Sequence, residues 1–391
     1  MKFKNFETLA IRTQLERSQQ KEHAVPIYMT SSYLFDSAED AAAIFKGELE
    51  GNIYSRYSNP NTNELIEKLK QMEFCEDGVV TASGMAAVYT SFGALLKSGD
   101  HIIACKAIFG NSKYILNKIL PDVGIEVTYV DIHDKEAWEK AVQPNTKMLF
   151  VESPSNPTLQ TADMEFLGKL CKAHDIIYSV DNCFATPYLQ QPQKFGADLV
   201  IHSATKYMDG QGRVLGGAIL GSTKYISQCY DFIKRTGAAL SPFNAWVLSK
   251  SLETLAIRMD RHCRNAAELA NFLEQQSDFD VVPYPHLKSN PQFELAKKQM
   301  SQGGGLVGCQ IKGGLARGAR FLNALKLHSL TANLGDTRSI ATHPASTTHS
   351  KLTLEEQLEI DITPGYVRFS VGLEHIDDII ADIDQALKIS K

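Results

Sequence analysis

The chain has 391 residues and carries 40 Lys+Arg against 45 Asp+Glu, so its formal net charge is −5. Without a basic excess to neutralise phosphate backbones, a dedicated nucleic-acid binder is disfavoured. The hydrophobic content of 43% excludes global disorder, and the length predicts two or three domains. No apolar run has the length of a membrane span, and Met1 to Glu22 lacks the apolar centre of a secretory signal.

Seven cysteines are spread widely along the chain, without a CxxC pair or a Cys/His cluster at metal-ligand spacing. We therefore expect reduced thiols in a cytoplasmic protein, most of them small buried side chains. His343 and His349 lie close in sequence, but no third ligand or acidic cluster accompanies them. No metal site is expected.

Residues 1–60 are predicted to form an irregular N-terminal arm. A short strand is expected at Met29 to Phe35 and a helix at Ala38 to Phe45, and the stretch from Gly51 to Asn61 is rich in loop-forming residues. An arm of this length needs a surface to pack on. That surface belongs either to its own domain or to a neighbouring subunit.

Residues 61–245 show a regular alternation of short apolar runs and helical patterns, which begins with a helix that Thr62 can cap. Strands are predicted at residues 101–105, 125–131, 147–151, 176–180, 198–202 and 215–220. Helices are predicted at residues 85–96, 111–119, 164–172 and 224–235. Fully apolar strands separated by helices indicate an α/β domain with a mostly parallel sheet covered on both faces.

The pattern changes after Ser241-Pro242. A long helical region, Phe243 to Glu274, is expected to connect two domains. Scattered strands follow at residues 306–311, 328–332 and 366–371, and the last helix carries one apolar stripe that includes Ile376, Ile379 and Ile383. Residues 246–391 are therefore predicted to form a smaller α+β C-terminal domain.

Three segments lie at strand ends, where doubly wound sheets bind their ligands. Ser83-Gly84-Met85 opens a helix whose free N–H groups can bind an anion. Asp181 ends an apolar strand, where it can face a cation or simply cap the next turn. Lys206 follows the hydroxyls of Ser203 and Thr205, and a desolvated lysine is a good nucleophile.

Each segment alone also fits a bland interpretation: a glycine turn, a helix cap or a surface lysine. Together they predict a pyridoxal phosphate (PLP) site. A lysine binds the aldehyde, an aspartate holds the pyridinium nitrogen, and hydroxyls with a helix N-terminus bind the phosphate.

The chain also resembles the cystathionine γ-synthase/methionine γ-lyase family, the trans-sulfuration enzymes that use PLP. The resemblance runs from about Ala24 to the C-terminus. It rests on these motifs: Tyr54-Ser-Arg56-Tyr-Ser-Asn-Pro60, Ser83-Gly-Met85, Glu152-Ser-Pro-Ser-Asn156-Pro157, Asp181-Asn182, Ser203-Ala-Thr205-Lys206-Tyr207, His343-Pro-Ala-Ser-Thr-Thr-His349 and Arg368-Phe-Ser-Val-Gly-Leu-Glu374. It implies the aspartate aminotransferase-like fold (fold type I), with the PLP-binding domain at residues 61–245.

The family's cofactor contacts transfer to matching positions of this sequence. The resemblance implies that Lys206 binds the aldehyde and moves protons, and that Asp181 pairs with the pyridinium nitrogen. It also implies that the phosphate is held by Gly84, Met85, Ser203 and Thr205. The ring would stack on Phe109, where most members carry a tyrosine.

The family's substrate and subunit contacts transfer in the same way. Arg368 would bind the substrate α-carboxylate in a bidentate contact, with help from Asn156 and Ser339. Tyr54 and Arg56 would reach into the neighbouring subunit's site, where the arginine binds phosphate and the tyrosine assists proton transfer. The resemblance therefore implies a homotetramer of two tight dimers, and the arm would contact the neighbouring subunit.

Two runs resemble those of O-succinylhomoserine sulfhydrylases: Asp209-Gly-Gln-Gly-Arg213 and Gly335-Asp-Thr-Arg338-Ser339. Arg338 would suit the distal carboxylate of a succinyl ester. Asn111 stands where methionine γ-lyases typically carry a cysteine. We therefore expect γ-replacement on an O-acyl-L-homoserine, most closely O-succinyl-L-homoserine with sulfide, giving L-homocysteine and succinate.

Other functions stay open at this point. Within the family they are cystathionine γ-synthase, with cysteine as nucleophile, and a γ-lyase that releases 2-oxobutanoate and ammonia. A catalytically silent scaffold of the same fold is disfavoured by the complete set of motif residues. A nucleotide-binding oxidoreductase would need a GxGxxG turn after an early strand, and none is present.

Overall fold

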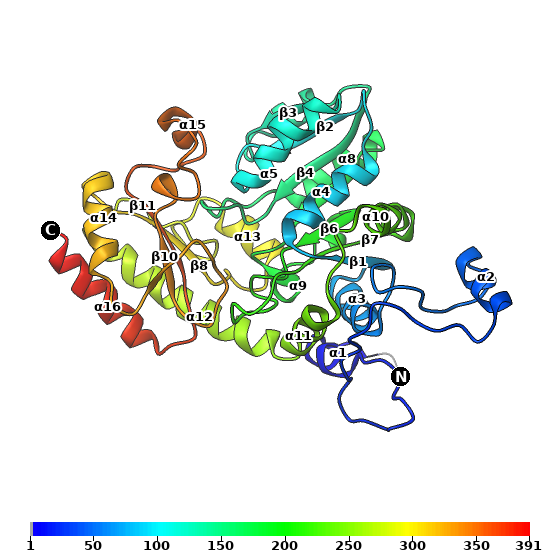
Figure 1. Cartoon of the computed structure of the whole chain (residues 1–391). Coiled ribbons are helices and arrows are strands. Elements are labelled where there is room, and N and C mark those ends of the chain that lie inside the picture. The colour runs from blue at the N-terminus through cyan, green and yellow to red at the C-terminus, as the bar shows by residue number, and fades with distance from the viewer. Residues whose placement is uncertain (1–2) are drawn as a thin grey trace.

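Two β-sheets organise the chain, one in each of two domains that lie side by side (Figure 1). The computed structural model describes residues 3–391, so the first two residues of the predicted arm lie outside the described part. Because the structure contains a large, mostly parallel sheet with helices and a smaller second sheet, it confirms the α/β fold class.

The large sheet has the strand order β1-β7-β6-β5-β4-β2-β3. The strands from β6 to β3 run parallel, and β7 is antiparallel to both of its neighbours. Their bounds are β1 (Asp77–Thr81), β2 (His101–Cys105), β3 (Glu126–Val130), β4 (Thr146–Glu152), β5 (Ile177–Asp181), β6 (Leu199–His202) and β7 (Gly217–Gly221). The sequence patterns missed β1, an edge strand with a polar and a glycine residue at its start.

Helices cover the large sheet, and their buried faces complete the first hydrophobic core. They are α3 (Pro60–Glu73), α4 (Gly84–Leu95), α5 (Gly110–Tyr114), α6 (Leu120–Asp122), α7 (Lys135–Lys140), α8 (Met164–His174), α9 (Thr186–Leu189) and α10 (Thr223–Thr236), with a π-helical turn at Ile115–Ile119 and a 3₁₀ turn at Pro192–Phe195. The predicted cap of α3 is corrected: Asn59 is the N-cap, and Thr62 completes its capping box from inside the helix.

The small sheet has the order β8-β11-β10-β9, with β8 (Leu306–Gln310), β11 (Tyr366–Ser370), β10 (Ile340–Thr342) and β9 (Ser329–Leu330). The same part of the chain contains α13 (Phe293–Gln299), α14 (Gly314–Ala324), α15 (Leu354–Leu358), α16 (Ile376–Ile389) and a 3₁₀ turn at Pro344–Ser346, of which α14 packs against β11. The apolar stripe of α16 is buried as expected, with Ile379 and Ile383 in a second core beside Phe369.

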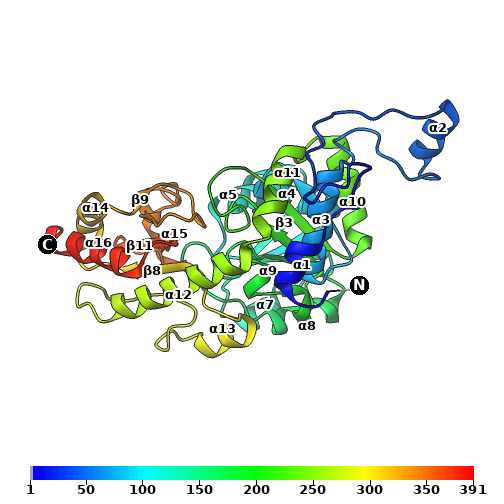
Figure 2. The same ribbon diagram turned by 90° about the horizontal axis from the view of Figure 1, so that it is seen from below.

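The predicted helical region from Phe243 to Glu274 is confirmed, and the structure divides it into two helices. These are α11 (Pro242–Leu252) and α12 (Leu255–Glu274). At the break, the carbonyl of Ser251 accepts a hydrogen bond from the Arg258 side chain. Helix α12 begins in the first core and ends in the second (Figure 2), so the cores divide inside α12. The domain boundary at 245/246 stays a prediction.

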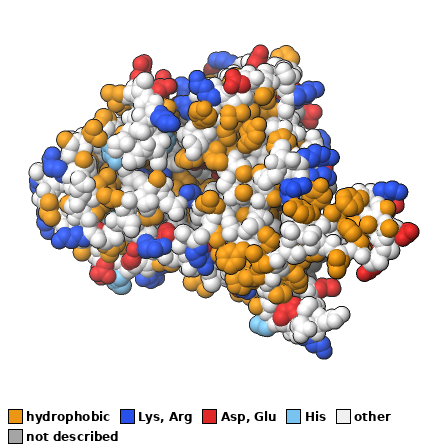
Figure 3. Space-filling view, in the orientation of Figure 1, with side chains coloured by type: hydrophobic (Ala, Val, Ile, Leu, Met, Phe, Trp, Pro, Cys, Tyr) orange, Lys and Arg blue, Asp and Glu red, His pale blue; other side chains and the backbone are white. Residues whose placement is uncertain are grey.

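The arm contains α1 (Phe6–Arg12) and α2 (Ala38–Lys46), and α2 stands away from the body of the molecule (Figures 1 and 2). The expected strand at Met29 to Phe35 is wrong: within it only Ser32 forms an isolated bridge, because no sheet edge lies beside it. Hydrophobic side chains gather on the arm (Figure 3), where Leu34 is 100% exposed and Met29 70% exposed. Such exposed apolar surface marks an interaction site.

Candidate active site

A cavity of about 260 Å³ lies between the two sheets, at the carboxyl ends of β4, β5 and β6. Most of the residues that the sequence singled out line it: Gly84, Met85, Phe109, Asn156, Asp181, Ser203, Thr205, Lys206 and Arg368. Those from the large domain come together because parallel strands end at the same edge of a sheet, whereas Arg368 comes from β11 of the small sheet. Asn111 also lines the cavity.

One wall is an anion cradle at the start of α4. A Cβ atom on Gly84 would lie 2.5 Å from the Cβ of Ser203, so only glycine lets the helix approach this strand end so closely. The hydroxyl of Ser83 caps the helix by accepting from the Ala86 amide over 3.2 Å. The first-turn amides of a helix have no partners inside it, so this wall offers donors to a phosphate.

Two carboxyl groups lie side by side on neighbouring strands, one buried (Glu152) and one half-buried (Asp181). Glu152 on β4 is paired in register with Asp181 on β5. Burial raises the pKa of Asp181 to about 6. Burial, and then the charge of Asp181, raises the pKa of Glu152 well above its ordinary value, although one of its oxygens accepts from the Phe109 amide over 2.8 Å. A cation here would favour ionisation of Asp181.

Lys206 reaches the cavity from the loop after β6. Its Nζ donates to Oδ1 of Asn333 over 2.8 Å, and burial lowers its pKa. A lysine with a lowered pKa is more readily the free amine that attacks a carbonyl. Sequence reasoning missed Asn333, which lies two residues before Gly335. A Cβ on Gly335 would lie 2.7 Å from the Tyr207 amide nitrogen, so this glycine lets the Asn333 segment lie close to the Lys206 turn, a contact that only the fold reveals.

Arg368 is the cationic group on the opposite side of the cavity. It lies on β11, is 1% exposed, and its Nη1 donates to Oδ1 of Asn156 over 2.7 Å. Its Nε has no hydrogen-bond partner among residues 3–391. A buried guanidinium with an unused donor is suited to a carboxylate.

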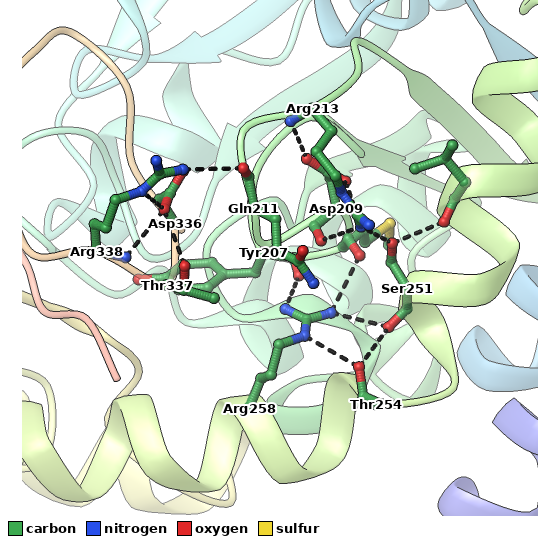
Figure 4. A network of polar contacts seen from close by, with 12 residues as sticks. Tyr207, Asp209, Gln211, Arg213, Ser251, Thr254, Arg258, Asp336, Thr337 and Arg338 are labelled. Atoms are coloured by element: carbon green, nitrogen blue, oxygen red, sulfur yellow. Dashed lines mark hydrogen bonds and ion pairs between the residues drawn. The ribbon is translucent and has the colours of Figure 1, made fainter. Parts of the chain in front are cut away.

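Two predicted substrate contacts lie outside the cavity lining. The amide and hydroxyl of Ser339 both donate to the Glu374 carboxylate, over 2.7 and 2.9 Å. Arg338 forms an ion pair with Asp336 at 2.8 Å and donates to the Gln211 carbonyl (Figure 4). Arg338 can bind a distal carboxylate only if this pair opens, so that contact stays a prediction.

Tyr54 and Arg56 also lie away from the cavity of their own chain. Arg56 donates through Nε to the Lys234 carbonyl over 2.9 Å, and its guanidinium lies 5.1 Å from the centre of the Tyr54 ring. Their expected action in a neighbouring subunit stays a prediction. Within residues 3–391, no cluster of three or more His, Cys, Asp or Glu residues has the arrangement of a metal site, and no helix has the length and apolar character of a membrane span.

Sequence comparisons place the chain among known enzymes. The model of the family described as "Cys/Met metabolism PLP-dependent enzyme" matches residues 7–388. An O-succinylhomoserine sulfhydrylase from Pseudomonas aeruginosa is 44% identical over 98% of this chain and 95% of its own length. An L-methionine gamma-lyase from Pseudomonas putida is 43% identical over 93% of this chain and 92% of its own length.

Solved structures of PLP-dependent enzymes of sulfur amino-acid metabolism have the same fold as this chain. A Campylobacter jejuni protein assigned as an O-acetylhomoserine (thiol)-lyase has a TM-score of 0.95 and 37% identity, and the match covers 98% of this chain and 100% of that one. That structure contains N'-pyridoxyl-lysine-5'-monophosphate. Cystathionine gamma-lyase from Lactobacillus plantarum has a TM-score of 0.93 and 31% identity, with 99% of each chain covered.

Proposed function

We propose that this chain, which belongs to the Cys/Met metabolism family of PLP-dependent enzymes, is an O-succinylhomoserine sulfhydrylase. The reaction is O-succinyl-L-homoserine plus hydrogen sulfide giving L-homocysteine plus succinate. The bond from Cγ to the ester oxygen breaks, and a bond from Cγ to sulfur forms. The 44% identity to an enzyme of that name, which extends over nearly the whole chain, supports this proposal.

The observation that carries the proposal is the composition of the cavity. One space of about 260 Å³ is lined by the amine of Lys206, the buried guanidinium of Arg368 and the half-buried carboxyl group of Asp181. An amino-acid substrate needs a cation for its α-carboxylate and a base near its α-carbon. Both are present on one cavity.

The residues of this chain fit PLP. The cradle of Gly84 and Ser203, where a Cβ would collide, leaves backbone and hydroxyl donors for the phosphate, together with Met85 and Thr205. Asp181 would hold the ring nitrogen, Phe109 would stack on the ring, and Lys206 would bind the aldehyde. When bound, PLP withdraws electrons from the substrate α-carbon and so stabilises negative charge there.

In the proposed reaction, Arg368 binds the substrate and Lys206 transfers protons. Arg368, fixed by Asn156, holds the α-carboxylate and so presents the α-carbon to Lys206. The Lys206 amine, whose pKa burial lowers, removes a proton from Cα and then one from Cβ, which makes the γ-ester labile. Because one amine serves both carbons, its position relative to Arg368 is critical.

An L-methionine γ-lyase is the second candidate, because such an enzyme is 43% identical to this chain. Asn111 argues for the sulfhydrylase: it lines the cavity at the position where methionine γ-lyases typically carry a cysteine. Cystathionine γ-synthase differs only in using cysteine in place of sulfide. A small change in the contacts of the nucleophile separates these activities.

The test is a matrix of esters and nucleophiles with the purified holoenzyme. O-succinyl- and O-acetyl-L-homoserine are each supplied with sulfide, with cysteine and with neither. We expect homocysteine from the succinyl ester and sulfide to form fastest. Dominant cystathionine would assign the synthase, and 2-oxobutanoate without a nucleophile would assign a γ-lyase.

Lys206→Ala is the control for that matrix. It removes the amine that serves both carbons, so the rate should fall by a factor of at least about 10²–10⁴. Borohydride reduction followed by mass spectrometry should label Lys206 in the wild type and leave the variant unlabelled. A variant that keeps the wild-type rate would contradict the assignment of Lys206.

A further inference from the structure

Arg258 is a buried arginine of α12 that forms hydrogen bonds almost entirely with backbone. It is 6% exposed, and its donors go to the carbonyls of Tyr207 at 2.6 Å, Met208 at 3.2 Å and Ser251 at 3.0 Å (Figure 4). Burial lowers its pKa to about 10. Burying a guanidinium without a direct carboxylate partner costs free energy. A buried arginine of this kind is expected where its hydrogen bonds hold a particular backbone conformation.

The backbone that Arg258 binds is the turn that directly follows Lys206. The Gly210 amide closes this turn by donating to the Lys206 carbonyl over 2.8 Å. Gly210 has a φ of +70°, and a Cβ there would lie 2.1 Å from Nη1 of Arg258. The turn therefore packs closely against the Arg258 guanidinium. The side chain of Lys206, at the start of the same turn, lines the cavity.

The same helix holds the segment that follows Arg368. The His262 ring bonds through Nδ1 to the Val371 carbonyl at 2.6 Å, and Asn265 donates to the Gly372 carbonyl at 2.9 Å. Burial lowers the pKa of His262 to about 4, so the neutral ring can donate through Nδ1. Positions 258, 262 and 265 follow helical spacing and share one face of α12.

We propose that Arg258 is a positioning residue, which fixes the Lys206 turn to α12 while His262 and Asn265 fix the segment after Arg368 to the same helix. Helix α12 thereby sets the distance between the Lys206 amine, which acts at the α-carbon, and the Arg368 guanidinium, which binds the α-carboxylate. The inference rests on the proposed function only in taking Lys206 as the reactive lysine. It does not depend on which ester or nucleophile is used.

The test compares Arg258→Met, which removes the donors, with Arg258→Lys, which keeps the charge and part of the bonding. Arg264→Met is the matched control, because Arg264 is exposed on the same helix. We expect Arg258→Met to lower kcat by about 10–100-fold with KM changed by less than about threefold, because misplacement of a bound group acts on the chemical step. Arg258→Lys should recover part of kcat, and Arg264→Met should match the wild type.

Hydrogen–deuterium exchange on the cofactor-free proteins gives a readout that needs no activity. Arg258→Met should speed exchange selectively in residues 203–213, and the apoprotein should bind PLP more weakly. Equal kcat per folded site in Arg258→Met and Arg264→Met, with unchanged exchange at 203–213, would overturn the proposal. If Arg258→Met does not fold, Arg258→Lys decides: a loss of thermal stability alone, with wild-type kcat and exchange, means a purely structural residue.

If no ester supports turnover in the wild type, the proposed function fails. Exchange at 203–213 and PLP binding still decide the function of Arg258, so the two failures are distinguishable.

Discussion

Glu152 and Asp181 are paired in register on β4 and β5 and both line the cavity, where Glu152 is buried and Asp181 is half-buried. Two neighbouring carboxyl groups in a low-dielectric site resist ionisation together. The pair therefore lowers the stability of the cofactor-free protein at pH values where a carboxyl group is ionised. A bound pyridinium would relieve that loss of stability.

Asp181→Asn should stabilise the cofactor-free protein in a pH-dependent manner. The pKa of Asp181 is raised from 3.8 to about 6 in the folded chain, so its stabilising contribution is present below pH ~4 and is lost as pH rises through 6. Asparagine stays neutral throughout. The variant should melt a few degrees higher than the wild type above pH ~6 and equally below pH ~4.

Thermal melts of the cofactor-free proteins across that pH range check this prediction. Asp122→Asn, at an exposed position on α6, is the control and should not shift the melting temperature. With PLP loaded, the advantage of Asp181→Asn should disappear. A difference in melting temperature that is the same at every pH would contradict the explanation.

Asn156→Ala should weaken substrate binding more than turnover. It removes the shorter hydrogen bond of the Arg368 guanidinium, leaves the 3.4 Å bond to the Asn333 carbonyl, and so gives that buried cation more freedom to shift. A hydrogen bond to a charged group contributes about 1.5–3 kcal/mol, so KM should rise by about tenfold or more with a smaller change in kcat. Steady-state kinetics measure both, with Asn271→Ala on the exposed side of α12 as the control. An unchanged KM would show that Asn156 does not contribute to binding of the substrate carboxylate.

Arg338→Glu tests the predicted contact with a succinyl carboxylate. If the Asp336–Arg338 pair opens for substrate, KM for the succinyl ester should rise much more than KM for the acetyl ester. Lys351→Glu supplies the same charge change at another exposed position. Equal effects on both esters would show that Arg338 only joins Asp336 to the Gln211 loop.

Mixed subunits test the action of Arg56 on a neighbouring chain. Lys206→Ala and Arg56→Ala chains should each be poorly active alone. When the two are refolded together, one site in each mixed dimer should combine an intact Lys206 with an intact Arg56, so activity should return. If Arg56 acts within its own chain, no mixed dimer regains a working site.

The size of the assembly is a separate measurement. Light scattering should give the mass of a tetramer for the wild type, since the exposed apolar residues of the arm, Met29, Leu34 and Phe45, then have a partner. Replacing Leu34 with Asp should weaken the assembly. A monomeric wild type would contradict both the tetramer and the trans action of Arg56.

The alternation of apolar runs and helices was sufficient to predict most of the large sheet, because β2, β4, β6 and β7 are buried along almost their whole length and are therefore mainly apolar. Strand β1, at the edge, was missed. The strand ends at Gly84, Asp181 and Lys206 were predicted to meet for an equally local reason: parallel strands end at one edge. The arm was predicted less well. Its apolar residues indicate burial, but the sequence of one chain does not say whether a sheet or a second chain covers them.

Contacts between residues far apart in sequence could be found only from the tertiary structure. Lys206 bonds to Asn333, 127 positions away, and Arg258 bonds to Tyr207, 51 positions away. Arg338 donates to the carbonyl of Gln211, 127 positions away, rather than lying free beside the cavity. Residue type and periodicity set which face of a helix or strand is buried. The partner of a polar side chain depends on how those elements pack, so it appears only when the whole chain is folded.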